Sequence, residues 1–287
     1  MTETVPGGIA LAVAAAAAYE GAYILQATEA RALAAGSRPA RVLALLIQRR
    51  RWTAGLALSG VGALLQVLAL HVAPLTVVQP TLALGVVALV IIGGRVLAEP
   101  TRGTDVVAAG ALALGVTLIA IAGADLGSRP VDAGAAAAAL GTLAAILAVA
   151  VLARQAPPLL LVVGAGAGDS LAALAAERLA HGWDLLALVW IAPAAAAVVG
   201  SLSTEMAAVS RWPATRVGPC VLALQTAVPV LLAPVVAGER WGAHAGPIAA
   251  GLLLVVGAGG VLAASAARFE RREPGADHVC RIGQGKP

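Results

Sequence analysis

The amino-acid sequence predicts an all-α, polytopic membrane helix bundle, with about nine transmembrane helices in an inverted 4+1+4 repeat. Three observations support this fold class: an apolar composition, regularly spaced apolar segments, and a helix pair that recurs in both halves. Of the 287 residues, 60% are hydrophobic and 12% are charged, and the mean hydropathy is +0.91. Soluble domains are about half apolar and about a quarter charged, so this composition excludes an ordinary soluble domain.

The glycines, the net charge and the cysteines and histidines give further information on the kind of protein and its ligands. The 33 glycines, with many alanines, allow membrane helices to approach closely. The net charge of +4 does not indicate a nucleic-acid partner, because the basic residues fall between the apolar segments. Cys220 and Cys280 form no Cys-x-x-Cys pair and the four histidines are scattered. The sequence therefore predicts no cofactor, and it leaves a metal ion as an unknown.

Segments of about 17–25 apolar residues can cross a bilayer as helices. Residues 28–51 form the longest internal loop, whose apolar patch at 42–47 is too short to span, and residues 268–287 form a polar tail. The nine predicted spans are residues 7–27, 52–73, 75–97, 104–124, 133–153, 158–177, 184–204, 216–237 and 244–267.

The positions of Lys and Arg predict the orientation. If the N-terminus is outside, all 19 basic residues except Arg129, Arg178 and Arg240 fall in cytoplasmic segments. Cytoplasmic loops carry an excess of Lys and Arg. The sequence therefore predicts a multi-pass protein of the cell (inner) membrane, with its N-terminus outside and its C-terminus in the cytoplasm.

A helix pair at residues 68–123 recurs near the C-terminus. Pro80 lies 19 residues before Glu99, and Pro219 lies 20 residues before Glu239; a glycine-bearing apolar helix follows each pair. The predicted units are a first half at 1–124, a linking span at 125–157 and an inverted second half at 158–267. Inverted repeats of this kind build secondary transporters, whose binding sites lie near the bilayer midplane.

Two ionisable residues, Glu20 and Asp169, lie well inside predicted spans. A carboxylate in hydrocarbon costs about 2.5 kcal/mol or more, so such residues are candidates for function. Tyr19, Glu20, Tyr23 and Gln26 share a sector of roughly 120° at helical spacing, which predicts one wall of a polar cavity. Protonated carboxyls would suit proton coupling, ionised ones would bind a cation, and a purely structural role also remains open.

Gln79 and Pro80 are the second group of candidates. A proline inside a span frees a backbone carbonyl and often marks a kink beside a cavity, so we expect this pair to shape the pocket. The Gln79 amide could bind substrate or tie helices together. Glu99 and Glu239 end their spans and are expected to act as caps, hinges or gates. Ser170 has no Gly-x-Ser-x-Gly context, and the sequence predicts no enzyme.

The residues described above resemble the EamA-type repeat of the drug/metabolite transporter superfamily. The resemblance lies in residues 69–80, in Leu97-Ala98-Glu99, in the glycine-bearing helix that follows, and in Ala237-Gly238-Glu239-Arg240. It implies a transporter of amino acids, metabolites or drugs that works by alternating access. Members usually have ten spans, and this chain has one fewer, before residue 52.

Trp52-Thr53-Ala54-Gly55 is similar to the start of the second span in NIPA-type magnesium transporters. Gln66 stands where those proteins would carry an acidic residue, so Mg2+ transport is an alternative to transport of a small organic solute. A non-transporting membrane scaffold is the third possibility. The expected partners are a small-molecule or ion substrate and the lipid bilayer, and glycine-rich outer faces could support a homodimer.

Overall fold

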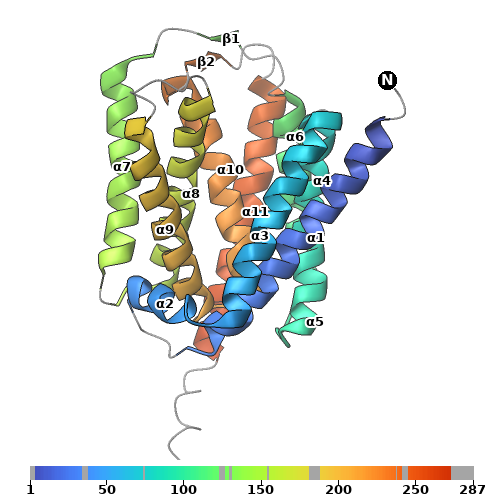
Figure 1. The fold of residues 1–287 in the computed structure, drawn as a ribbon, viewed down its shortest axis with the longest axis vertical. Coiled ribbons are helices and arrows are strands. Elements are labelled where there is room, and N and C mark those ends of the chain that lie inside the picture. The colour runs from blue at the N-terminus through green and yellow to red at the C-terminus, as the bar shows by residue number, and fades with distance from the viewer. Residues whose placement is uncertain are drawn as a thin grey trace, which may run out of the picture.

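The computed structural model describes residues 4–33, 38–73, 75–122, 127–128, 131–153, 155–180, 188–236, 238–240 and 245–272. Figure 1 shows these residues as a bundle of long helices that cross the molecule from end to end. The predicted all-α helix bundle is therefore confirmed.

Helices occupy every predicted span, over the part of the chain that the structure describes. After α4, a π-helical segment η1 (Leu89–Gly93) and a short α5 (Gly94–Val96) continue the same helix. The long helices are α1 (Thr4–Arg31), α3 (Arg50–Val72), α4 (Leu75–Ala88), α6 (Gly103–Ala122), α7 (Ala133–Leu152), α8 (Pro158–Ala180), α9 (Leu188–Val209), α10 (Ala214–Val236) and α11 (Ala245–Arg272).

Length and composition agree with membrane insertion. Within the described residues, 8 helices are long and apolar enough to cross a membrane, and Thr81–Val96 adds a shorter apolar helix. A bilayer core of about 30 Å needs about 20 apolar residues in a helix. The chain is accordingly a multi-pass membrane protein.

The long loop predicted at residues 28–51 contains a helix, α2 (Pro39–Leu46). Proline suits the first turn of a helix, where its missing N–H leaves no hydrogen bond unmade. Val42 and Leu46 are completely buried, and α2 packs chiefly on α9. The apolar patch is thus too short to span, as predicted, but it folds against one end of the bundle instead of forming an open loop.

Helix packing follows the same plan in both halves. In the first half α1 packs on α3 and α4, and α4 packs on α6. In the second half α8 packs on α9 and α10, and α10 packs on α11. Corresponding helices run in opposite directions in Figure 1, and α7 lies beside α8 as the additional helix. This arrangement matches the predicted inverted 4+1+4 plan.

The two halves meet most closely where α6 crosses α11. A Cβ atom added at Gly115 would lie 2.7 Å from the Gly251 carbonyl oxygen, and one at Gly251 would lie 2.8 Å from the Gly115 carbonyl oxygen. Glycine at both positions therefore lets the two backbones touch, as in other membrane helix pairs. The reciprocal contact is what corresponding elements of an inverted repeat would make.

A short pair of strands joins the loops of the two halves. β1 (Gly127–Ser128) pairs antiparallel with β2 (Glu239–Arg240), at the end of the bundle opposite α2. The backbone of Glu239 faces Ser128 in this pair, but the Glu239 side chain lies outside the described residues. Its predicted hinge or gating role therefore stays a prediction.

Large apolar side chains from five helices fill parts of the interior and are less than 2% exposed. They are Leu46, Trp52, Leu161, Met206 and Leu262.

Candidate functional site

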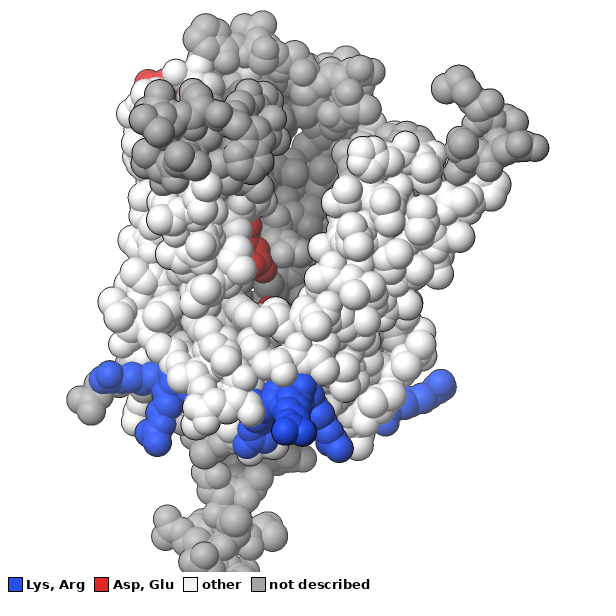
Figure 2. Space-filling model, viewed as in Figure 1, with Lys and Arg blue, Asp and Glu red and all other residues white. Residues whose placement is uncertain are grey.

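A cavity of about 910 Å³ lies between the two halves. Residues of α1, α3, α4, α6, α8, α9 and α10 line it, together with Leu89 of η1. Figure 2 shows a hollow with acidic side chains at its base, between the α1–α3 side and the α9 side of the molecule. The hollow extends from these acidic side chains away from the blue band of arginines.

We call the arginine-rich end of the bundle the basic end. It contains α2 and the beginnings or ends of the helices where Arg31, Arg50, Arg102 and Arg211 lie. The clustering agrees with the basic segments that the sequence places on one side of the membrane. On the face that Figure 2 shows, the hollow opens away from the basic end and narrows towards it.

The predicted sector of α1 forms one wall of the cavity. Tyr19, Glu20, Tyr23 and Gln26 all line it. The Tyr19 hydroxyl donates to the Gln66 side-chain oxygen of α3 at 2.8 Å, so α1 and α3 present one polar surface. Helical periodicity alone was sufficient to bring these four side chains together.

Glycines on neighbouring helices make room for these side chains. A Cβ atom at Gly85 would lie 3.0 Å from Glu20 Oε1, and one at Gly218 would lie 3.0 Å from the Tyr23 ring. Bulkier residues there would press on the two side chains. The remaining pairs are Gly62 with the Tyr19 ring and Gly55 with the Gln26 side chain.

Asp169 reaches the cavity from α8 and contacts α9. The Ser201 hydroxyl oxygen lies 2.6 Å from Asp169 Oδ1 and 2.9 Å from the Ala165 carbonyl oxygen. A hydroxyl has one hydrogen, so it cannot donate to both oxygens at once. Either Ser201 donates to an ionised Asp169, or a protonated Asp169 donates to Ser201 while Ser201 donates to Ala165. Both arrangements hold Asp169 in place at the cavity wall.

Glu205 of α9 is a third acidic residue that lines the cavity, and it was not among the predicted site residues. The predicted span ended at residue 204, whereas α9 continues to Val209. Hydropathy blurs the ends of a span, and a glutamate at a predicted boundary looks like a loop residue. The helical phase from Ser201 to Glu205, four residues apart, was the signal that could have found it.

Tyr23 lies beside Glu205 on the wall formed by α1. Its hydroxyl is buried and lies near enough to interact with the Glu205 carboxyl group, but no hydrogen bond of good geometry joins it to any residue that the structure describes. An unmade hydrogen bond at a buried hydroxyl costs about 1–3 kcal/mol. This hydroxyl is therefore available to a molecule in the cavity.

The other predicted pocket residues are placed less completely. Gln79 and Pro80 lie in α4, next to cavity-lining residues such as Leu82 and Ala83, but their side chains are outside the described residues. Their role in shaping the pocket stays a prediction. Gln225 of α10 also lines the cavity and adds an uncharged amide to it.

Glu99 does not line the cavity; it lies at the basic end and caps a helix of the other half. Its carboxylate accepts hydrogen bonds from the backbone N–H groups of Ala214 and Thr215 at 2.8 and 2.9 Å, and from the Thr215 hydroxyl at 2.6 Å. Arg31 of α1 adds an ion pair at 3.0 Å. A carboxylate at a helix N-terminus is stabilised by the unpaired N–H groups there. The predicted capping role of Glu99 agrees with this geometry.

The turn before Glu99 directs the Glu99 side chain towards the start of α10. Ala98 has a φ of 52°, the left-handed conformation that usually takes glycine, and it ends α5. The Glu99 N–H then donates back to the Gly94 carbonyl at 2.8 Å. The chain reverses sharply here, and the Glu99 side chain is thereby carried across to the second half.

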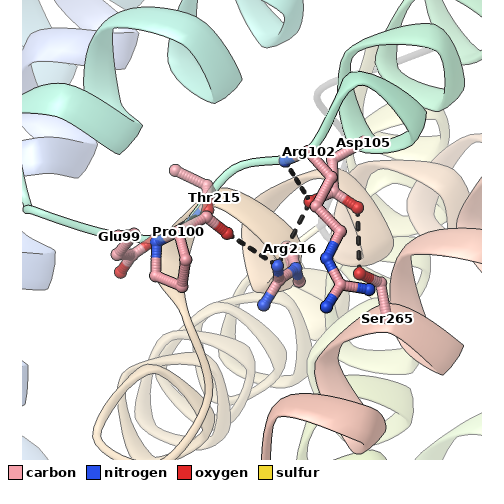
Figure 3. A network of polar contacts seen from close by, with 7 residues as sticks. All are labelled: Glu99, Pro100, Arg102, Asp105, Thr215, Arg216 and Ser265. Carbon is pink, nitrogen blue, oxygen red and sulfur yellow. Dashed lines mark hydrogen bonds and ion pairs between the residues drawn. The ribbon is translucent and has the colours of Figure 1, made fainter.

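A second acidic residue, Asp105 of α6, is paired at the basic end. Arg216 of α10 donates to Asp105 Oδ2 at 3.2 Å and to the Pro100 carbonyl at 2.8 Å, and Ser265 of α11 donates to Asp105 Oδ1 at 2.9 Å. Both side chains of the ion pair are at most 3% exposed. Figure 3 shows how Arg216 lies between the α5–α6 turn and the start of α6. We call Glu99, Asp105, Thr215, Arg216 and Ser265 the basic-end network.

The described residues contain no group of three or more His, Cys, Asp or Glu side chains that could hold a metal ion. Glu20, Asp169 and Glu205 reach the cavity from three different helices, α1, α8 and α9. A molecule that fills the cavity could contact carboxyl groups on more than one of these helices.

Comparisons with known proteins do not assign the chain to a family. No family model, no curated protein and no solved structure matches the chain. The resemblance to the drug/metabolite transporter superfamily therefore stays a prediction from the motifs.

Proposed function

We propose that this protein is a secondary transporter of small organic solutes that works by alternating access. The observation that carries the proposal is the acidic cavity between two inverted four-helix units, open at one end and closed at the other. Transporters with inverted repeats bind substrate near the midplane, where the two repeats meet. The predicted membership of the drug/metabolite transporter superfamily agrees with this function.

The basic-end network supplies the closed side of the cycle. Each of its main contacts joins the first half to the second: Glu99 to the start of α10, and Asp105 to Arg216 and Ser265. By the positive-inside rule we assign this end to the cytoplasm, so the cavity described here faces outside. Opening to the cytoplasm would separate residues 1–124 from 158–267 at this network, while the opposite end closes.

The Mg2+ alternative has weaker support. Mg2+ keeps several waters and needs near-octahedral oxygen ligands, often one or two carboxylates. The cavity carboxylates lie on separate helices, and much of the wall consists of apolar side chains such as Leu82, Val86, Leu202 and Val221. An apolar wall stabilises an organic body and does nothing for a hydrated ion.

Transport by reconstituted protein tests the proposal. Proteoliposomes with the full chain would be loaded with unlabelled amines or amino acids and given the labelled form outside, with Mg2+ uptake followed in parallel. We expect counterflow of at least one organic solute, at least tenfold lower with Glu20→Gln. Glu29→Gln is the matched control, because Glu29 is on the same helix but pairs with Arg49 at the basic end. Flux of Mg2+ alone, or no flux of any solute, would contradict the proposal.

A further inference from the structure

The cavity carries a specific charge and hydrogen-bonding pattern, from which we infer that its ligand is a protonated primary amine on an apolar body. The inference rests on the proposed transport function and narrows the solute to one chemical class. It depends on four features of the cavity: its charge, its hydrogen-bond acceptors, its apolar surface and its volume.

The charge of the cavity selects a cation. Glu20, Asp169 and Glu205 line it, and none of the described lining residues is Lys, Arg or His. A carboxylate in a region of low dielectric either takes up a proton or needs an opposite charge nearby, since an isolated buried charge is expensive. The carboxylates at the basic end, Glu99 and Asp105, pair with Arg31 and Arg216, whereas no described residue that lines the cavity is a cation. A ligand cation would fill this position.

The acceptors of the cavity select a cation with N–H groups. Ionised carboxylates only accept hydrogen bonds, so each needs a donor. Beside Glu205, the Tyr23 hydroxyl is buried without a hydrogen bond of good geometry to a described residue. A phenol oxygen accepts as well as donates. A primary ammonium has three N–H donors and can serve Glu205 and Tyr23 together, whereas a quaternary ammonium has none.

The apolar walls and the volume select an organic body. Val86 and Leu89 on one side and Val221 and Leu222 on the other line the same cavity as the carboxylates. A volume of about 910 Å³ falls in the range of sites that hold small organic molecules. The ammonium group would lie against the acidic wall, and the hydrocarbon would lie against these aliphatic side chains.

Binding to the purified full chain tests the inference with three probes that share a phenylethyl group, and with MgCl2. The probes are 2-phenylethylammonium, its N-trimethyl derivative, the neutral 2-phenylethanol, and MgCl2, each measured by isothermal titration calorimetry at pH 7. We expect 2-phenylethylammonium to bind at least tenfold more tightly than either analogue, because hydrogen bonds to charged groups contribute enough for such a factor. Steric exclusion of the trimethyl group would not explain the difference in a cavity of this volume.

Variants then locate the contacts. Glu205→Gln should weaken binding of 2-phenylethylammonium about tenfold or more, and Tyr23→Phe about three- to tenfold, while Glu29→Gln leaves it unchanged. Tyr23→Phe keeps the ring that packs on Gly218, so it separates the hydroxyl from the packing. Elution as a single species with an unchanged unfolding midpoint would show that each variant is folded.

Four results would overturn the inference. Equal binding of 2-phenylethanol would show that charge is not recognised, and equal binding of the trimethyl derivative would show that N–H groups are not. Binding of MgCl2 without the ammonium would make the cavity an ion site. Counterflow of a neutral or anionic solute in the proteoliposomes, with no amine binding, would overturn this inference and leave the proposed transport function intact.

Discussion

Five carboxyl groups of the described residues lie in the interior between the helices, and they belong to two regions that differ in how their charges are matched. At the basic end, Glu99 accepts three hydrogen bonds and pairs with Arg31, and Asp105 pairs with Arg216 and Ser265. In the cavity, Glu20, Asp169 and Glu205 have no Arg, Lys or His among the described residues around them. A carboxylate therefore has a structural role at the basic end, where the protein itself supplies the cation and the hydrogen-bond donors.

This difference implies that the basic end contributes to stability and the cavity to ligand binding. Paired carboxylates hold the two halves together, so their loss should reduce stability. No described residue supplies a cation to the cavity carboxylates, so neutralising them should leave stability intact and remove binding. Substitutions in the two regions should therefore have different effects on stability.

Arg216→Ala should have the largest effect on folding. It would leave Asp105 buried without its cation, which typically costs about 3–5 kcal/mol. Thermal unfolding of the purified protein in detergent, followed by circular dichroism, measures this. The double variant Asp105→Asn, Arg216→Met should recover part of the loss, because no charge is then left unpaired. Unchanged stability in Arg216→Ala would contradict the structural role of this pair.

Glu99→Ala should destabilise the protein by about 2 kcal/mol. The substitution removes the acceptor of two backbone N–H groups at the start of α10 and of the Thr215 hydroxyl. Hydrogen exchange at Ala214 and Thr215 reports the effect locally, and exchange there should become faster. Protection as strong as in the parent would mean that another group caps α10.

Arg31→Ala should cost less than about 1 kcal/mol. Its side chain is 39% exposed, so water can take over much of its interaction with Glu99. The same unfolding assay applies, and the effect should shrink further at high salt. A loss as large as that of Arg216→Ala would show that exposure does not separate the two ion pairs.

Glu205→Gln should change the free energy of unfolding by no more than about 0.5 kcal/mol, since no protein cation depends on that charge. Its matched substitution is Asp105→Asn at the basic end, where Arg216 does depend on the charge. Both variants would be unfolded in the same detergent. If Glu205→Gln were the more destabilising of the two, the comparison between the regions would be wrong.

The sequence was sufficient for the helices because hydropathy over about 20 residues decides which segments can cross a bilayer. The sequence was also sufficient to predict that α1 forms one wall of the cavity, since helical periodicity alone places Tyr19, Glu20, Tyr23 and Gln26 on one face. Glu205 was missed because periodicity identifies a face only inside a segment already recognised as a helix. Boundaries are the weakest part of such predictions.

The basic-end network could not be predicted in the same way. Asp105 and Arg216 are 111 residues apart, and Glu99 and Thr215 are 116 residues apart. Only the packing of the two halves brings them together. Likewise, the sequence shows α2 only as a short apolar patch in a basic loop. The burial of Val42 and Leu46 depends on the packing of α2 on α9, which is distant in the sequence.

Side-specific labelling of the cavity tests the central claim that the basic end is closed while the cavity is open on the other side. Ala173 lines the cavity and is exposed, so Ala173→Cys would be labelled with a membrane-impermeant maleimide from each side, in a background where Cys220 and Cys280 are replaced. The account predicts reaction from the side opposite the basic end only, and reaction from both sides when Glu99→Ala is added. Equal reaction from both sides in the parent, or reaction only from the basic end, would contradict it.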